Sequence, residues 1–340
     1  MNQYQNEFKN IVNYIASLPT NASVLIGGHE NPDGDSVASL VVMKKLVESF
    51  GKKASILINK QEIPNAEIFN SIEVDKMVDS KVADLFILLD CAKKSRLGVN
   101  EKFFDNAKYT INIDHHENNL HESNIVCSCP QISATCEILY ELFKNQKIVI
   151  NKETAELLFS GICSDTFGLS RNYSKNTFSC INELSKLGID CATLTREIYL
   201  KKSEGEMRFL AKAISEMRQT NGLHSFLFLE SDFKKYKVSY NEVFKKIVPE
   251  LQNIDGVKLL LVSYISSDGE QFGELRSSCQ IDVDVLATEL GGGGHKKASG
   301  FHNKNGLMKN MTIINNYIKN HNHENKSAIN SADNKNIKEF

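Results

Sequence analysis

The chain has 340 residues, of which 41% are hydrophobic and 24% are charged. Its 40 lysines and arginines nearly balance its 42 aspartates and glutamates, so the formal net charge is only −2. This balance excludes a bulk basic surface that would hold long nucleic acid by counterion release. With a mean hydropathy of −0.29, the composition is that of an ordinary globular protein, which disfavours disorder and residence in a membrane. The length predicts two domains.

The N-terminal segment and the cysteines indicate where the protein works. Phe8, Ile11, Val12 and Ile15 recur at helical spacing, and the segment lacks the continuous apolar core of a signal peptide. The eight cysteines include no C-x-x-C pair and no zinc-finger spacing, which predicts reduced, mostly buried thiols. We therefore expect a cytoplasmic enzyme that is not attached to a membrane.

Short apolar runs alternate with longer stretches of helical period in the first half of the chain. This alternation is typical of an α/β fold with a parallel sheet and crossover helices. Strands are predicted at 24–27, 54–58, 84–90 and 109–114, and helices at 36–50, 133–143, 152–161 and 175–187. The first helix connects the first two strands as a βαβ unit.

The second half predicts a smaller α/β domain. Strands are predicted at 223–229, 257–263 and 272–277, with helices at 240–252 and 282–290. The mostly polar stretch before them is interpreted as a helical connector rather than a core element. From residue 321 the chain has too few apolar residues to offset the entropy of ordering, which predicts a disordered tail. The predicted parts are 1–192, the connector 193–218, 219–320 and the tail 321–340.

Polar residues follow three of the predicted strands at the point where each strand ends. They are His29, Asp33 and Asp35 in GGHENPDGDS, Asp90 at the end of LFILLD, and Asp114, His115 and His116 at the end of YTINIDHH. The carboxyl ends of parallel strands form the ligand crevice of such a sheet. A Pro-Asp-Gly turn with a helix cap is the alternative. That alternative explains Asp35 or Ser36, but not His29 together with Asp33.

A fourth carboxylate, Asp165 in GICSDTFG, follows a predicted helix, where a cap for the next segment is the competing interpretation. Four carboxylates at one sheet edge would repel strongly, because two unit charges at about 4 Å cost about 4 kcal/mol at an effective dielectric near 20. Two divalent cations would balance them. Mixed carboxylate and imidazole donors suit Mn²⁺ better than Mg²⁺. The sequence therefore predicts a two-metal hydrolytic site.

The motifs HENPDGDS, LLDCA, DHH and SDT, followed by GGGGHKKASG, occur in this order along the chain. The ordered set closely resembles the DHH phosphoesterase family with its DHH-associated C-terminal domain, over about residues 20–302. Within the family, the chain is most similar to the nanoRNase and pAp phosphatase branch, close to the enzymes that cleave cyclic di-AMP or its linear product pApA. The resemblance implies an active site in the cleft between the two domains.

The resemblance also implies roles for the polar residues. It implies two Mn²⁺ per chain, with Mg²⁺ or Co²⁺ as substitutes. His29 and Asp33 would bind one ion, Asp35, His115 and Asp165 the other, and Asp90 both. His116 is then assigned to the substrate phosphate, and Asp114 to orienting the imidazoles. One departure concerns the residue after the Asp-Thr pair, where Phe167 replaces the glycine that is common in the family.

Recognition of the substrate is assigned to the second domain. Arg276 in GELRSS offers a planar fork suited to a terminal phosphate, beside the hydroxyls of Ser277 and Ser278. The run GGGGH, with Gly293, Gly294 and His295, is expected to expose backbone amides in a nest that holds an anion, although a helix C-terminal stop is the plainer interpretation. Arg96 is expected to pair with Asp90 or to reach a phosphate.

These assignments predict an enzyme that hydrolyses short oligoribonucleotides to mononucleotides and pAp to AMP. A signalling phosphodiesterase for cyclic di-AMP or pApA shares every predicted metal ligand and is the alternative. From another class, a nucleotide-binding regulator that has lost catalysis remains open. We expect a short oligonucleotide or nucleotide as the partner, no long nucleic acid, and, by analogy with the family, a homodimer.

Overall fold

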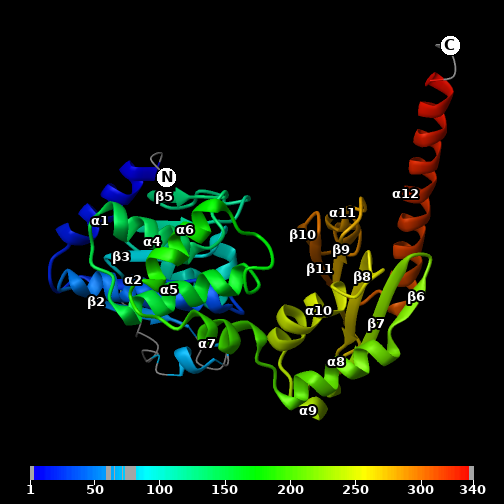
Figure 1. The fold of residues 1–340 in the computed structure, drawn as a ribbon, viewed down its shortest axis with the longest axis horizontal. Coiled ribbons are helices and arrows are strands. Elements are labelled where there is room, and N and C mark those ends of the chain that lie inside the picture. The colour runs from blue at the N-terminus through cyan, green and yellow to red at the C-terminus, as the bar shows by residue number, and fades with distance from the viewer. Residues whose placement is uncertain (1–3, 59–62, 65, 71, 73–81, 337–340) are drawn as a thin grey trace. The chain divides into compact units, whose positions relative to one another are not determined.

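The computed structural model describes residues 4–336 apart from 59–62, 65, 71 and 73–81, with side chains up to residue 321. The chain forms two compact units, Met1–Lys201 and Lys202–Phe340, which are described separately (Figure 1). The division between them falls inside the predicted connector, 193–218. In the described residues, no helix combines the length and the apolar character needed to cross a membrane.

A parallel sheet of five strands forms the centre of the first unit, in the order β2-β1-β3-β4-β5 (Figure 1). The strands are β1 Ser23–Gly27, β2 Lys53–Leu57, β3 Leu85–Leu89, β4 Thr110–Asp114 and β5 Ile125–Ser128. Every residue of β3 is buried, as expected for a parallel strand covered on both faces. The predicted parallel sheet is confirmed. The edge strand β5 was not predicted, because its short, half-buried run has no distinct apolar pattern.

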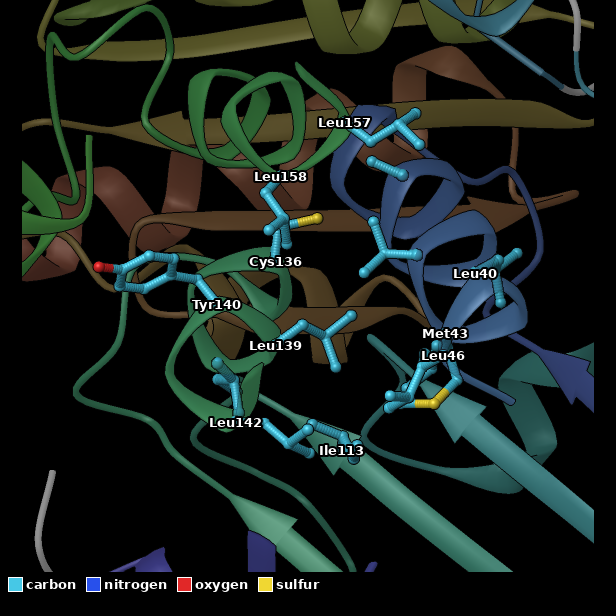
Figure 2. Close-up of a cluster of buried hydrophobic side chains, with 14 of the residues drawn as sticks. Leu40, Met43, Leu46, Ile113, Cys136, Leu139, Tyr140, Leu142, Leu157 and Leu158 are labelled. Carbon is cyan, nitrogen blue, oxygen red and sulfur yellow. The ribbon is translucent and has the colours of Figure 1, made fainter. Parts of the chain in front are cut away.

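Helices cover both faces of this sheet. They are α1 Gln5–Ser17, α2 Gly34–Ser49, η3 Glu67–Phe69, η4 Lys94–Asn100, α3 Glu101–Asp105, α4 Thr135–Asn145, α5 Lys152–Asp165, α6 Lys175–Ser185, α7 Cys191–Thr195 and η5 Arg196–Leu200. On one face, Leu40 and Met43 of α2 pack with Leu139 of α4 and Leu157 of α5 (Figure 2). On the other face, a second cluster gathers Phe86 of β3 with residues of η4 and α3.

Close packing of α2, α4 and α5 depends on Gly161 of α5. A Cβ added to Gly161 of α5 would overlap the Cys136 thiol and lie 2.7 Å from the carboxylate of Asp35. The backbone of α5 therefore approaches the start of α2 and of α4 directly. This approach brings polar groups from three helices to the same end of the sheet as the ends of β1, β3 and β4.

The second unit contains a mixed sheet of six strands in the order β10-β11-β9-β8-β7-β6 (Figure 1). The strands are β6 Arg218–Thr220, β7 Leu223–Leu229, β8 Leu259–Ile265, β9 Gln271–Ser277, β10 Gly293–His295 and β11 Ala298–Asn303. Only the β7–β8 pair is parallel among these described strands. The three strands that were predicted here are present.

Each face of the mixed sheet carries its own core. The helices are α8 Glu204–Glu216, α9 Ser231–Tyr236, the π-helical η6 Glu242–Ile247, α10 Val248–Gln252, α11 Val283–Glu289 and α12 Leu307–Asn336. Along β9, alternate side chains point to opposite faces: Phe272 packs against the core under α8 and η6, and Leu275 belongs to the core under α11 and α12.

Two expectations about this part of the chain differ from the structure. Phe209 and Ala213 of α8 are fully buried in the core of the second unit, so this half of the predicted connector is a core element. Its alternating charged residues concealed the narrow apolar stripe. The segment from residue 321, for which we predicted disorder, continues α12 as a helix to Asn336 in the structure.

Candidate metal centre

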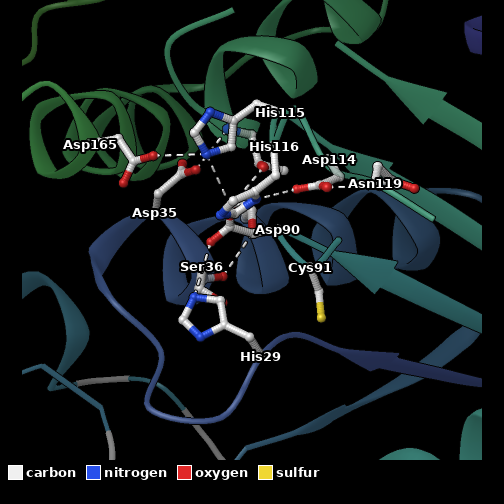
Figure 3. A network of polar contacts seen from close by, with 12 residues as sticks. His29, Asp35, Ser36, Asp90, Cys91, Asp114, His115, His116, Asn119 and Asp165 are labelled. Atoms are coloured by element: carbon white, nitrogen blue, oxygen red, sulfur yellow. Dashed lines mark hydrogen bonds and ion pairs between the residues drawn. The ribbon is translucent and has the colours of Figure 1, made fainter. Parts of the chain in front are cut away.

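The strand order of the first unit places the ends of β1 and β3 at a topological switch point. The chain leaves β1 toward β2 on one side, whereas β3, β4 and β5 follow on the other side. Crevices for ligands form at such points, beyond the carboxyl ends of the strands. Figure 3 shows polar side chains gathered there from α2, β4, α5 and the segments that follow β1, β3 and β4.

His29 follows β1 and is buried at 6% exposure. Its Nδ1–H donates to the backbone carbonyl of Glu30 at 2.6 Å, which leaves Nε2 as the atom that faces Asp90, 3.5 Å from its Oδ2. Asp33 caps α2, because its side chain accepts the backbone N–H of Ser36 at 3.1 Å. The helix cap that we considered for Asp35 or Ser36 is therefore formed by Asp33.

Asp90 lies directly after β3 and is buried at 2% exposure. Its backbone adopts a φ of 53°, a left-handed conformation that is uncommon for residues other than glycine. The carboxylate lies 3.4 Å from His115 Nε2 and accepts a hydrogen bond of 3.1 Å from the Thr135 hydroxyl. Burial would raise the pKa of Asp90, but the imidazoles of His115 and His29 hold it well below its usual range.

Asp35, His115 and Asp165 form a second group beside Asp90. His115 Nε2 lies 3.0 Å from Asp165 Oδ2. The buried carboxylate of Asp35 accepts the first backbone N–H groups of α4, from Thr135 at 2.7 Å and Cys136 at 2.9 Å. The positive end of a helix dipole favours an anion at this position.

Repulsion between these carboxylates changes how readily they ionise. Burial, followed by the charges of Asp165 and Asp90, raises the pKa of Asp35 well above its usual range. Burial and then the charge of Asp33 raise the pKa of Asp165 to about 6. Burial alone would lower the pKa of His115, but the hydrogen bonds with Asp165 and Asp90 raise it. The cluster therefore requires bound protons or cations to exist at neutral pH.

A chain of hydrogen bonds orients the last member of the cluster, His116. Its Nδ1 lies 2.7 Å from Asp114 Oδ1, and Asn119 Nδ2 donates to Asp114 Oδ2 at 2.7 Å and to Asn112 at 2.6 Å (Figure 3). Asp114 and Asn112 are both buried on β4. In the DHH triplet, His115 is therefore turned toward Asp165, and His116 is held by Asp114.

The six predicted metal ligands meet in two groups of three. His29, Asp33 and Asp90 form one, and Asp35, His115 and Asp165 the other. Within each group, one ligand atom from each residue lies within 4.8 Å of the others. A third group, Asp90, His115 and His116, overlaps both. Carboxylate and imidazole donors in this mixture fit divalent ions such as Mn²⁺, and the converging buried carboxylates supply the negative charge that such ions neutralise.

Two residues of the cluster were missed by sequence reasoning. Thr135 donates to Asp90, and Asn119 donates to Asp114. Each lies in a motif without any distinctive spacing, and Thr135 reaches Asp35 across 100 residues of chain. Their positions depend on tertiary packing, so the sequence carries no local signal for them.

The departure at Phe167 has a structural counterpart. Phe167, Leu169 and Asn172 adopt φ values of 51°, 66° and 57°, so three non-glycine residues of the loop after Asp165 are in the left-handed region. The guanidinium of Arg171 lies 3.5 Å over the centre of the Phe167 ring, and the Tyr199 ring lies nearly perpendicular to the Phe167 ring, with 6.2 Å between the ring centres. These ring contacts stabilise the strained turn.

Only some of the predicted substrate residues of the second unit lie close together. Arg276 lies on β9 with Glu274, to which it is ion-paired, and both line a pocket of about 270 Å³ with Gly293. Ser277 points to the opposite face of β9, where it is buried and bonded to Cys279. The structure does not bring Ser277 together with Arg276.

Ser278 and Gly294 are hydrogen-bonded within the second unit. Ser278 donates to the carbonyls of Val257 and Lys258. The GGGGH run is not an open nest, because Gly293–His295 forms β10, and the Gly294 amide donates to Asp284 at 2.6 Å. His295 is exposed on that strand.

Arg96 lies in η4 and is exposed. Among the residues that the structure describes, its guanidinium forms no ion pair with Asp90, whose charged partners there are histidines. Its backbone carbonyl instead accepts the Glu30 N–H at 2.7 Å. Arg96 therefore shapes the loop after β1 through its main chain.

The parallel sheet with its Asp and His cluster, together with the mixed-sheet unit, defines a class of two-domain phosphoesterases. Residues 23–162 match the DHH family, N-terminal domain, and residues 234–320 match the DHHA1 domain. The chain therefore belongs to the DHH phosphoesterases that carry a DHHA1 domain, which confirms the resemblance drawn from its motifs.

Several known proteins are similar to this chain. The probable bifunctional oligoribonuclease and PAP phosphatase NrnA of Streptococcus mutans is 26% identical, over 90% of this chain and 96% of that protein. The cyclic-di-AMP phosphodiesterase PdeA of Listeria monocytogenes is 25% identical, over 80% of this chain but 43% of that protein. The crystal structure of an exopolyphosphatase-related protein from Bacteroides fragilis has the same fold, with a TM-score of 0.81 at 21% identity over 93% of this chain and 96% of that one.

Proposed function

We propose that this protein is a Mn²⁺-dependent phosphoesterase that hydrolyses short oligoribonucleotides to mononucleotides and pAp to AMP. The observation that carries the proposal is the convergence of six Asp and His side chains into two groups around Asp90. In this proposal, His29 and Asp33 hold one ion, Asp35, His115 and Asp165 the other, and Asp90 both. When bound, the two ions would activate water and stabilise the negative charge that develops on the phosphoryl oxygens.

The chain's own residues orient these ligands. The bond from His29 Nδ1 to Glu30 fixes the tautomer that leaves Nε2 available as a ligand atom. The α4 amides hold Asp35, and the Thr135 hydroxyl holds Asp90. Asp114 fixes the ring of His116 through Nδ1, so that Nε2 is the atom that contacts the substrate phosphate and gives a proton to the departing oxygen.

Arg276 is proposed to bind the terminal phosphate. Its ion pair with Glu274 holds the guanidinium in the pocket, and a planar fork suits a phosphate with two free oxygens. Recognition through one terminal phosphate favours short substrates. The near-neutral net charge agrees with this preference, because few phosphates would be neutralised on binding.

Sequence identity does not separate the NrnA type from the signalling phosphodiesterase. This chain is 26% identical to NrnA of Streptococcus mutans and 25% identical to PdeA of Listeria monocytogenes. Cyclic di-AMP hydrolysis therefore remains the second candidate, since both activities would use the same metal ligands.

A substrate panel tests the proposal. The purified full chain with Mn²⁺ should convert pApA to AMP and pAp to AMP plus phosphate, and it should leave a long single strand largely intact. A chelator and the variant Asp90→Asn are the matched inactive controls. If pApA and pAp both remain intact with Mn²⁺ present, the proposal is wrong. Faster turnover of cyclic di-AMP than of pApA would support the second candidate, and nucleotide binding without hydrolysis would indicate a silent regulator.

A further inference from the structure

The pocket around Arg276 has an aromatic wall, and binding of a phosphate does not explain why that wall is aromatic. Besides Glu274 and Arg276 on β9, it is lined by residues of two other segments: Tyr240, Phe244 and Lys245, and Gly293, Ala298, Ser299 and Gly300. The pocket lies entirely within the second unit. A volume of about 270 Å³ exceeds what a phosphate group alone would fill.

The pocket is open because small residues lie opposite the charged ones. In the β9–β11 pair, Gly300 faces Glu274 and Ala298 faces Arg276. Directly opposite residues of antiparallel strands share a face, so this face of β11 is nearly bare above the two charges. A Cβ at Gly300 would lie 3.6 Å from the nearest atom, the Gly273 carbonyl oxygen. Packing therefore does not require glycine there, and its effect is to leave space.

Tyr240 forms one wall of this space. Its ring lies 4.4 Å from the Phe244 ring at an angle of 34°. Phe244 is buried, whereas 44% of Tyr240 is exposed. An aromatic ring that is supported on one side by a buried ring and is open to solvent over nearly half its surface can accept a second planar group. Phe244 belongs to the π-helical turn η6, a conformation that often occurs at functional sites.

The aromatic wall lies close to the phosphate-binding charges. Burial, then the nearby carboxylate of Glu274, raises the pKa of Tyr240 to about 12, and Arg276 acts in the opposite direction. Lys245 adds a second cation to the pocket lining. Burial raises the pKa of Glu274, and the nearby charges of Arg276 and Lys245 act in the opposite direction. A planar wall and two cations within one pocket match the two ends of a nucleotide, its base and its phosphate.

We propose that Tyr240, supported by Phe244, is the stacking platform for the nucleobase of the nucleotide whose phosphate Arg276 binds. The inference rests on the proposed function and adds the reason why a nucleotide, rather than another phosphate ester, is selected. Stacking is tolerant of base identity because every base has a π face. The platform therefore selects for the presence of a base and not for adenine in particular.

Binding of two matched probes to the full, Mn²⁺-loaded chain tests this platform. AMP carries a base, and ribose 5-phosphate is the same phosphate ester without it. Wild type should bind AMP about 5- to 150-fold more tightly than ribose 5-phosphate, which is the range expected for one stacked base. Tyr240→Ala should bring the ratio close to one by weakening AMP alone, and Tyr240→Phe should keep the wild-type ratio. Calorimetric titration measures both affinities.

Two further variants separate the platform from loss of folding. Gly300→Leu should also weaken AMP binding, because its side chain would fill the pocket while Tyr240 itself is unchanged. Tyr173→Ala is the matched control, since Tyr173 is 47% exposed and contacts a phenylalanine, Phe178, in the first unit; it should leave the ratio unchanged. The chain has no tryptophan, so Tyr240→Trp provides a single tryptophan whose emission AMP should quench and ribose 5-phosphate should not.

The outcomes distinguish this inference from the proposed function. An AMP preference that survives Tyr240→Ala, or a wild type that binds both probes equally, overturns the platform even if pApA and pAp are hydrolysed. Quenching of Tyr240→Trp by AMP with loss of preference in Tyr240→Ala supports the platform even if no hydrolysis is found. Unchanged emission with AMP bound to Tyr240→Trp overturns it.

Discussion

Substitution of Thr135 by valine tests how the cluster is held in place. Thr135 is fully buried at the start of α4, and its hydroxyl donates to Asp90 at 3.1 Å while its backbone N–H donates to Asp35 at 2.7 Å. Valine keeps the shape and the backbone bond and removes only the hydroxyl. When His29 and His115 use their Nε2 atoms to bind metal, they no longer donate to Asp90, and the hydroxyl of Thr135 still does.

The expected loss follows from the bond that is removed. A hydrogen bond to a charged group contributes about 2 kcal/mol, which corresponds to a change of about 30-fold in an equilibrium constant. Residues that orient metal ligands typically change metal affinity or activity by about 10- to 100-fold when they are removed. Thr135→Val should therefore raise the Mn²⁺ concentration required for half-maximal pApA hydrolysis about 30-fold.

Steady-state turnover of pApA across a Mn²⁺ titration measures this effect. Thr135→Ser keeps the hydroxyl and should stay within about threefold of wild type. Thr110→Val is the matched control, because Thr110 is also buried and its hydroxyl bonds to Asn124 rather than to a residue of the cluster. Wild-type Mn²⁺ dependence in Thr135→Val, or an equal loss in Thr110→Val, would refute the reasoning.

Three further predictions concern the cluster and the phosphate pocket. Asp90→Asn should lower pApA turnover about 10³-fold or more, because it removes the carboxylate charge shared by both metal sites while the side chain keeps its shape. Single-turnover kinetics measures this loss, and a variant that kept more than a tenth of the wild-type rate would contradict the prediction. Arg276→Ala should raise the KM for pApA about 10- to 100-fold, because it removes a charged contact made through two hydrogen bonds. Arg276→Lys should recover part of this loss. A changed Mn²⁺ content in either variant would count against the assignment of Arg276 to the substrate phosphate. Saturating Mn²⁺, at about 100 times its Kd, should raise the melting temperature by about 5–10 °C over chelated protein. This difference in melting temperature should grow from about pH 5.5 to about pH 7.5. Because the pKa values of Asp35, Asp165 and His115 are raised, the chelated folded protein binds more protons than the unfolded chain, and its free energy of unfolding falls as the pH rises through those values. Metal binding, by contrast, needs deprotonated ligands. Calorimetry with and without chelator checks both statements, and a gap that narrows with rising pH would contradict them.

The elements that sequence reasoning found are those with a strong local pattern. The run Leu85–Leu89 is continuously apolar and is followed by Asp90, and Thr110–Asp114 is followed by two histidines. Because parallel strands end at one edge of a sheet, the strand pattern alone brings these side chains together. The same logic located His29 after β1.

What the sequence could not show depends on contacts between distant segments. The glycines of β10 suggest a loop, but they form a strand because β11 supplies the hydrogen bonds. Asp35 holds the first amides of α4, about 100 residues away along the chain. Ser277 looked like a neighbour of Arg276 in sequence, although alternation along β9 places the two on opposite faces.

The metal content of the native protein tests the central claim most directly. Equilibrium dialysis of the full chain against Mn²⁺, followed by elemental analysis, should find two ions per chain, and fewer in Asp90→Asn. A wild-type chain that retains no Mn²⁺ at millimolar concentrations would contradict the claim that these carboxylates and imidazoles converge to hold a pair of cations.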